Sequence, residues 1–202
     1  MHIDTDRAAR EWIEAHFKEW HDQLTAKEID ALETYKGNGY AEINAALRGL
    51  GPSDAHGRNL VRALDSALSS YRLDQAVIVY RAFCVPEIAD LFDIEDLDGT
   101  DEYQDPAFAS TSLLRSVAET FALNEDDPDL RIIGQIHLPG GIHAISVGSP
   151  EVIKDLNEAE ILLPRATTLR ILETSEPNDH QRFRTLKMEA LNDHEGTAKQ
   201  NS

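Results

Sequence analysis

The hydrophobic period of this chain changes near residue 72, and this change limits what the chain can fold into more than any other feature. Before it, apolar residues recur at spacings of three and four, which is typical of amphipathic helices. After it, short β-branched runs and turn residues dominate, which is typical of strands. Because helices come first and strands follow, the pattern predicts an α+β fold whose N-terminal helices pack on two largely antiparallel sheets.

Four helices are expected in the N-terminal part. The first carries one apolar stripe, formed by Ala9, Trp12, Ile13, Phe17, Trp20 and Leu24. Thr25 and Glu28 form a capping-box pattern, which predicts the start of the second helix. Gly37 and Gly39 are expected to break that helix, and a third then covers residues 40–47. The fourth carries Leu60, Val61, Leu64 and Leu68.

Strands are expected over residues 76–80, 107–112, 130–138, 142–147, 158–163, 168–173 and 182–191. The turn Pro139-Gly140-Gly141 predicts a hairpin of the two strands that flank it, and Pro164 lies inside a second strand pair. Pro86 and the Ser116–Glu119 capping-box pattern predict two short helices. The acidic residues 93–105 are expected to form a solvated loop.

Size and charge restrict the class of protein. The 202 residues suit one domain, with a helical part at 1–72, a β-rich part at 73–191 and a flexible polar tail at 192–202. The formal net charge of −18 would repel a phosphate backbone, so no nucleic-acid partner is expected. The single cysteine, Cys84, excludes an intramolecular disulfide. A monomer is expected.

Neither a membrane segment nor a metal site is expected. No window approaches 18 consecutive apolar residues, and the N-terminus lacks the basic and apolar regions of a secretory signal. The chain is therefore expected in the cytoplasm, or delivered into the cytosol of a target or host cell. The eight histidines show no metal-ligand spacing.

Two segments of the β-rich part suggest a catalytic or binding role only when they are considered together with further segments of the chain. Arg81 ends an apolar strand, where its charge could point at a ligand. Ser110 and Ser112 share one face of a later strand, and Thr111 takes the other. Taken singly, a salt bridge at a strand end and an ordinary polar edge strand explain these residues equally well.

A pair of glutamates forms the third such segment. Glu158 and Glu160 lie two residues apart where a strand begins, so both carboxylates are expected to face the same way. Two like charges side by side destabilise a strand. The pair is therefore expected to meet a cation, and a splayed, solvated pair is the alternative.

Taken in order, the arginine, the Ser-Thr-Ser segment and the Glu-x-Glu pair resemble the ADP-ribosyltransferase exoenzyme family, in the branch named for its Arg–Ser–Glu signature. Upstream, residues 35–48 are similar to the family's Tyr…Gly-Tyr-x-x-Ile-Asn-x-x-Leu-Arg helix. Downstream, residues 160–165 are similar to its Glu-aliphatic-Leu-Leu-Pro-Arg strand. The resemblance extends from about residue 30 to residue 173.

The resemblance implies a cleft that binds NAD as a substrate, and an enzyme that transfers ADP-ribose from NAD to a side chain of a target protein. The catalytic residues that it implies are Arg81, Ser110, Glu158 and Glu160. Glu160 would stabilise the cation-like ribose of the cleavage step, and Ser110 would hold Glu160. The NAD-binding residues that it implies are Tyr35, Asn44, Arg48, Arg81, Ala82, Thr111, Ser112 and Phe121.

The acceptor is also implied by the resemblance. In this family, a glutamate at the position of Glu158 goes with arginine acceptors, and a carboxylate can attract a guanidinium group and accept its proton. Residues 149–157 look like the family's target-recognition loop, with Val152, Ile153 and Leu156 as candidate contacts.

Departures from the family pattern and other functions remain open. The family usually has glycine where this chain has Ala82. Some toxins of the family have an arginine shortly after the position of Phe121; this chain has none there, so that phosphate contact is absent or comes from Arg131. An NAD glycohydrolase, with water as the acceptor, would use the same site. An inactive ADP-ribosyltransferase-like binding module is a further alternative. The family includes bacterial toxins, injected effectors and phage enzymes.

Overall fold

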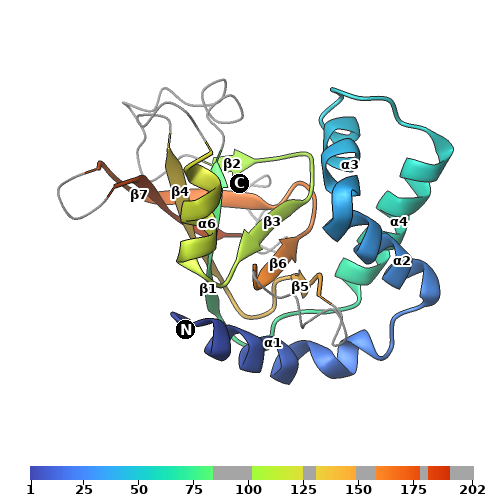
Figure 1. The fold of residues 1–202 in the computed structure, drawn as a ribbon, viewed down its shortest axis with the longest axis horizontal. Helices are drawn as coiled ribbons and strands as arrows, with labels where there is room; N and C mark the ends of the chain where they lie inside the picture. Colours follow the sequence, from blue (N-terminus) through green and yellow to red (C-terminus); the bar gives the residue numbers. More distant parts are fainter. Residues whose placement is uncertain (84–101, 125–130, 149–157, 178–181, 192–202) are drawn as a thin grey trace, which may run out of the picture.

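The computed structural model describes residues 1–83, 102–124, 131–148, 158–177 and 182–191 (Figure 1). Its helices are α1 (Asp6–His21), α2 (Ala26–Thr34), α3 (Tyr40–Leu47), α4 (Ala55–Ser69) and α6 (Arg115–Ala122), with a π-helical turn, η1 (Tyr35–Gly39). Its strands are β1 (Val77–Phe83), β2 (Glu102–Gln104), β3 (Ala109–Ser112), β4 (Ile132–Leu138), β5 (Ile145–Ser146), β6 (Glu160–Leu163), β7 (Thr168–Ser175) and β8 (Arg184–Ala190).

The predicted N-terminal helices are confirmed. The apolar stripe is buried in α1 from Ala9 to Trp20, whereas Leu24 lies beyond the end of the helix and is half-buried. Helix α3 covers the expected residues. The capping box of α2 forms as well: the backbone N–H of Glu28 donates to Thr25 Oγ1, and that of Thr25 donates to the Glu28 carboxylate. Helices α2, α3 and α4 group together at one side of the sheet, whereas α1 runs along its lower edge (Figure 1).

The glycines between α2 and α3 produce a kinked π-helical turn. The backbone of η1 leaves helical geometry at Gly37, where φ is −71° and ψ is −124°. A Cβ atom at Gly39 would lie 2.7 Å from the carbonyl oxygen of Thr34, so this close approach requires glycine. Single π-helical turns often occur at functional sites, because they redirect the side chains around them. Here Tyr35 is buried and Lys36 is half-buried.

All eight strands form one hydrogen-bonded sheet, in the order β2-β7-β8-β4-β1-β3-β6-β5. Its pairs are antiparallel except for β4 and β8. The α+β class with largely antiparallel strands is therefore confirmed, but the expected two sheets are joined into one. The junction is narrow, because β1 and β3 share only the pair Tyr80 and Ser112.

Neither of the two predicted strand pairs forms. The turn at residues 139–141 does separate β4 from β5, but β4 pairs with β1 and β8, and β5 pairs with β6. Similarly, β6 pairs with β3 and β5, whereas β7 pairs with β2 and β8. The reason is the length of the available partner: β4 matches all seven residues of β1, whereas β5 has only two.

The predicted acidic loop and the predicted end of the first strand also need correction. Residues 102–104 form β2, which pairs with β7 and buries Tyr103. Asp105, which was expected in solvent, is only 6% exposed. Strand β1 continues beyond Arg81 to Phe83, because β4 pairs with it along its whole length.

The start of α6 differs from its prediction. The helix begins at Arg115, and the Ser116–Glu119 capping box does not form. Instead, the carboxylate of Glu119 accepts a hydrogen bond from Arg115 Nε at 2.9 Å. The interpretations placed on Cys84, on the helix at Pro86, and on residues 149–157 and 192–202 lie outside the described residues.

One large apolar core joins the helices to the sheet, and it includes residues from Ile3 to Ala190. A smaller cluster around Tyr80 and Ile133 lies between α6 and the sheet. Strand β1 separates the two, so its alternate residues face different clusters. Val79 packs in the large core, whereas Ala82 packs against the small cluster.

Candidate active site

The glutamate pair lies at the start of β6. Glu160 is the first residue of this strand and lies opposite Ser112 of β3. Glu158 precedes the strand, and Ala159 between them has a left-handed backbone with a φ of 43°. The strand alternation predicted for the pair therefore does not apply. The carboxylates nevertheless converge, because both face Lys36 of η1.

The two carboxylates share one cation but differ in exposure. Lys36 Nζ lies 3.4 Å from Glu160 Oε2 and 3.8 Å from Glu158 Oε2. The side chain of Glu158 is 48% exposed, whereas that of Glu160 is 11% exposed. Glu158 is thus accessible to a second molecule while Glu160 is enclosed.

A chain of hydrogen bonds runs from α3 to Glu160. Asn44 Nδ2 donates to Tyr35 Oη at 3.0 Å, and Tyr35 Oη lies 3.2 Å from Ser110 Oγ. Ser110 in turn hydrogen-bonds to Glu160. Either hydroxyl group can donate in the contact between Tyr35 and Ser110, and an ionised Glu160 only accepts. Residues from α3, η1 and β3 thereby orient one carboxylate on β6.

Some features of the environment of Glu160 destabilise its ionised form, and others stabilise it. Burial raises the pKa of Glu160, and Lys36 and the hydrogen bond from Ser110 lower it. The negative charge of Glu158 raises this pKa again, and the net shift is upward. Burial and Glu158 therefore favour the protonated form of Glu160, whereas Lys36 and Ser110 favour the ionised form.

A second cluster of charged side chains surrounds Asp105. Arg48 binds this carboxylate with two hydrogen bonds, from Nε to Oδ1 at 3.0 Å and from Nη2 to Oδ2 at 2.5 Å. Burial raises the pKa of Asp105, but the hydrogen bonds from Arg48 and from the backbone of Ala107, with the charges of Arg48 and Arg81, lower it below its ordinary value. Arg81 also donates to the carbonyl oxygen of Ser110 at 2.8 Å, so this group adjoins the hydrogen-bond chain.

Two of the predicted NAD-binding hydroxyl groups hold the strands together. Thr111 Oγ1 donates to the carbonyl oxygen of Ile161 at 2.7 Å. Ser112 Oγ donates to the carbonyl oxygen of Glu158 at 2.5 Å and accepts from the backbone of Leu114. Ser112 therefore positions the backbone of Glu158.

Ala82 and Phe121 contribute apolar side chains, and the first of them adjoins the small apolar cluster. Ala82 packs against that cluster from β1. Phe121 extends from the end of α6 and is 51% exposed. An exposed aromatic ring at such a position can stack on a planar ligand.

Sequence patterns identify neither Lys36 nor Asp105 as residues of the site. Lys36 stands at a position that the family-like pattern leaves open, and Asp105 falls in the acidic segment. Each meets its partner across the chain, 124 positions from Glu160 and 57 positions from Arg48, respectively. The sequence feature that could have predicted them is charge balance. A converging carboxylate pair and a half-buried arginine are each stable only with a counter-ion nearby.

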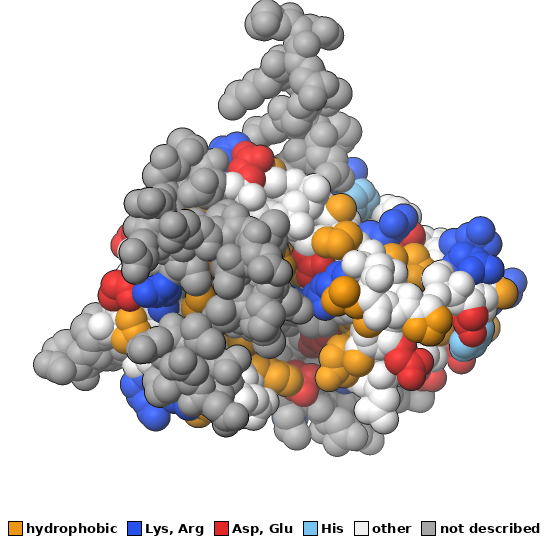
Figure 2. Space-filling model, turned by 90° about the horizontal axis from the view of Figure 1, so that it is seen from above, with side chains coloured by type: hydrophobic (Ala, Val, Ile, Leu, Met, Phe, Trp, Pro, Cys, Tyr) orange, Lys and Arg blue, Asp and Glu red, His pale blue; other side chains and the backbone are white. Residues whose placement is uncertain are grey.

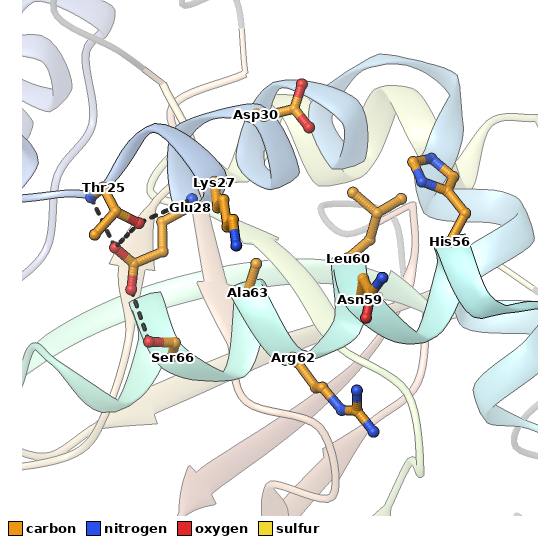
Figure 3. A pocket seen from close by; sticks show the side chains of 10 residues that line it. All are labelled: Thr25, Lys27, Glu28, Asp30, His56, Asn59, Leu60, Arg62, Ala63 and Ser66. Carbon is orange, nitrogen blue, oxygen red and sulfur yellow. Dashed lines mark hydrogen bonds between the residues drawn. The ribbon is translucent and has the colours of Figure 1, made fainter.

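The space-filling view shows acidic and basic side chains side by side in a recess of the surface (Figure 2). A separate groove of about 560 Å³ lies between α2 and α4, and Figure 3 shows its lining residues. None of them is a candidate site residue; the hydrogen bond from Ser66 to Glu28 there joins the two helices. In the described ranges, no helix could cross a membrane and no group of side chains could hold a metal ion.

Comparison with known proteins was made at the level of family, sequence and structure. The model of the ADP-ribosyltransferase exoenzyme family matches residues 9–193. Vis of Vibrio splendidus, named as an ADP-ribosyltransferase, is 28% identical over 180 residues, covering 81% of this chain and 69% of Vis. The NAD(+)–arginine ADP-ribosyltransferase EFV of Enterococcus faecalis is 27% identical over 150 residues, covering 72% of this chain and 28% of EFV. The structure of C3stau2 from S. aureus with NAD has a TM-score of 0.75 at 19% identity, covering 95% of this chain and 98% of that one.

Proposed function

The chain belongs to the ADP-ribosyltransferase exoenzyme family, and from this premise we propose that it cleaves NAD and transfers ADP-ribose to an arginine of a target protein. One observation carries the proposal. The buried carboxylate of Glu160 is held by Ser110, while the more exposed carboxylate of Glu158 stands beside it. The name of EFV describes the same activity for that relative, and Vis is named as an ADP-ribosyltransferase.

The distribution of charge suits NAD. The pyrophosphate of NAD is anionic, and a forked guanidinium group such as Arg48 or Arg81 can bind its oxygens. The nicotinamide ring is cationic until it leaves, and it would lie near the glutamates. Asn44 Oδ1 is buried without a hydrogen-bond partner among the described residues, so a ribose hydroxyl could satisfy it. Tyr35, Ala82, Thr111, Ser112 and Phe121 complete the proposed NAD-binding set.

Glu160 is proposed to act in the cleavage step. The bond between the nicotinamide nitrogen and C1′ of the ribose breaks, and its electron pair leaves with the nicotinamide. The ribose then carries positive charge at C1′, which a preorganised carboxylate stabilises. The hydrogen-bond chain from Asn44 through Tyr35 and Ser110 supports this role, because it holds Glu160 before the charge develops.

Glu158 is proposed to act in the transfer step. A guanidinium nitrogen of the target arginine attacks C1′ and loses a proton as the new bond forms. A carboxylate that is 48% exposed can meet such a group from solution and accept this proton. The proposal therefore assigns cleavage to the enclosed glutamate and acceptor binding to the exposed one.

The test is incubation of the protein with a cell lysate and NAD labelled in its adenylate half. The proposal predicts labelled protein, and mass spectrometry should locate the label on arginine. Glu160→Gln should abolish labelling, whereas Glu14→Gln, a change at an exposed glutamate on α1, should not. Free ADP-ribose without labelled protein would favour a glycohydrolase. Unconsumed NAD would favour an inactive binding module.

A further inference from the structure

Lys36 lies between the two glutamates of the site, at a position that no role assigned above explains. Its Nζ atom is 3.4 Å from Glu160 and 3.8 Å from Glu158, and its side chain is only 18% exposed. The ammonium group is therefore shared by two carboxylates that would otherwise face one another.

The backbone that carries Lys36 is firmly placed. The preceding residue, Tyr35, is 1% exposed, its ring packs edge-on against Phe108, and its hydroxyl group bonds to Asn44 and Ser110. A residue with such contacts cannot shift without disturbing the core. The lysine therefore projects from a fixed point of η1 toward β6.

The groups that act on Glu160 and on the neighbouring Tyr35 come from four places. Lys36 and Tyr35 approach from η1, and Ser110 from β3. Glu158 approaches from the turn before β6, and the charge of Arg81 on β1 acts on Tyr35. Of these, Lys36 is the cation in direct contact with Glu160. Without it, the charge of Glu158 would still act against that of the buried Glu160 carboxylate.

We infer that Lys36 is a positioning residue for the transfer reaction: its ammonium group holds Glu158 and Glu160 together and keeps Glu160 ionised for the cleavage step. The inference rests on the proposed function. If the cation is removed, uptake of a proton by the glutamate pair lowers both the cost of burying a charge and the repulsion between the two carboxylates. A protonated Glu160 cannot stabilise a positive ribose.

The first experiment measures the rate of NAD cleavage against pH for the wild type, Lys36→Met and Lys36→Arg. The ratio of the Lys36→Met rate to the wild-type rate should fall by roughly tenfold between pH 8 and pH 6, because protonation of Glu160 then extends to higher pH. Lys36→Arg should retain the wild-type pH profile, because it keeps the charge. The matched control is Lys27→Met, which removes an exposed lysine of the groove between α2 and α4.

A second change tests whether the repulsion from Glu158 is the cause. In Lys36→Met combined with Glu158→Gln, the cleavage profile should move back toward that of the wild type, since the repelling charge is gone. A profile equal to that of Lys36→Met alone would contradict the idea of a shared cation.

A direct titration separates this inference from the proposed function. Carbon-13 NMR of the glutamate carboxyl groups, with the Glu160 signal assigned through Glu160→Gln, requires no activity. The titration midpoint of Glu160 should lie at higher pH in Lys36→Met, and in Lys36→Gln as a second variant, than in the wild type. Unchanged midpoints would overturn the role of Lys36. A moved midpoint in a protein that leaves NAD intact would support it while refuting the proposed function.

Discussion

Two charged regions meet at the candidate active site, and they are built in opposite ways. In the first, the ammonium group of Lys36 faces two carboxylates, Glu158 and Glu160. In the second, the carboxylate of Asp105 is bound by Arg48 and lies within reach of the charge of Arg81. The first region has an excess of negative charge and the second an excess of positive charge.

The difference between these regions matches the polarity of NAD, with its cationic nicotinamide and its anionic pyrophosphate. Ser110 connects them, because its hydroxyl group bonds to Glu160 while its carbonyl oxygen accepts from Arg81. In the proposed function, the carboxylate region serves bond cleavage and the arginine region holds the substrate. Changes in the first should affect turnover, and changes in the second should affect binding and stability.

Glu160→Gln should have the largest effect. Loss of one preorganised electrostatic group costs about 10²–10³-fold in rate. Because cleavage precedes transfer, both NAD hydrolysis and protein labelling should fall by this factor. The measurement is release of nicotinamide, with the melting temperature as a check on folding. Near-normal activity of the folded variant would remove Glu160 from the catalytic role.

Glu158→Gln should separate the two functions proposed for the carboxylate region, which are cleavage of NAD and transfer of ADP-ribose to protein. NAD hydrolysis should persist, whereas transfer to protein should fall by roughly 10²-fold, because the acceptor guanidinium group loses its base. The ratio of free to protein-bound ADP-ribose measures this directly. A parallel loss of both activities would place Glu158 in the cleavage step. If neither changes, the arginine assignment loses its basis.

Arg81→Ala should weaken NAD binding and leave turnover at saturating NAD closer to that of the wild type. Removal of a charge-assisted hydrogen bond corresponds to roughly a tenfold rise in Kd. Isothermal titration with NAD gives the affinity. Arg48→Ala should also weaken binding, and it should lower the melting temperature, because it leaves the buried carboxylate of Asp105 without its partner. Unchanged affinity in both variants would leave these arginines with a structural role only.

The smallest expected effect concerns the pH dependence of stability at Asp105. Its folded pKa lies below the ordinary 3.8, so the charged form stabilises the fold above that value, and this contribution is lost as the pH falls through the folded pKa. Asp105→Asn should lower the melting temperature by roughly 2–8 °C at pH 7. The difference from the wild type should shrink below about pH 4. A constant difference down to pH 2 would show that packing, and not charge, is what the carboxylate contributes.

The candidate catalytic residues differ in how well the sequence alone predicts them. The order of Arg81, Ser110 and Glu160 suggested that they act together, and the structure places both Arg81 and Glu160 in hydrogen bonds with Ser110. The strand geometry predicted for the glutamates was wrong, because β6 begins only at Glu160. Their roles in catalysis stay predictions. The two counter-ions, Lys36 and Asp105, could not be assigned from their own sequence context.

The sequence by itself determined the N-terminal helices and most of the segments that become strands, with β2 as the exception. Helix caps and apolar stripes act between residues three or four positions apart, so their outcome for α1 to α4 is readable locally. Only the tertiary structure decided which strands pair and which charges meet. Those contacts join residues as far apart as Lys36 and Glu160, 124 positions along the chain, and local sequence carries no signal for a partner at that distance.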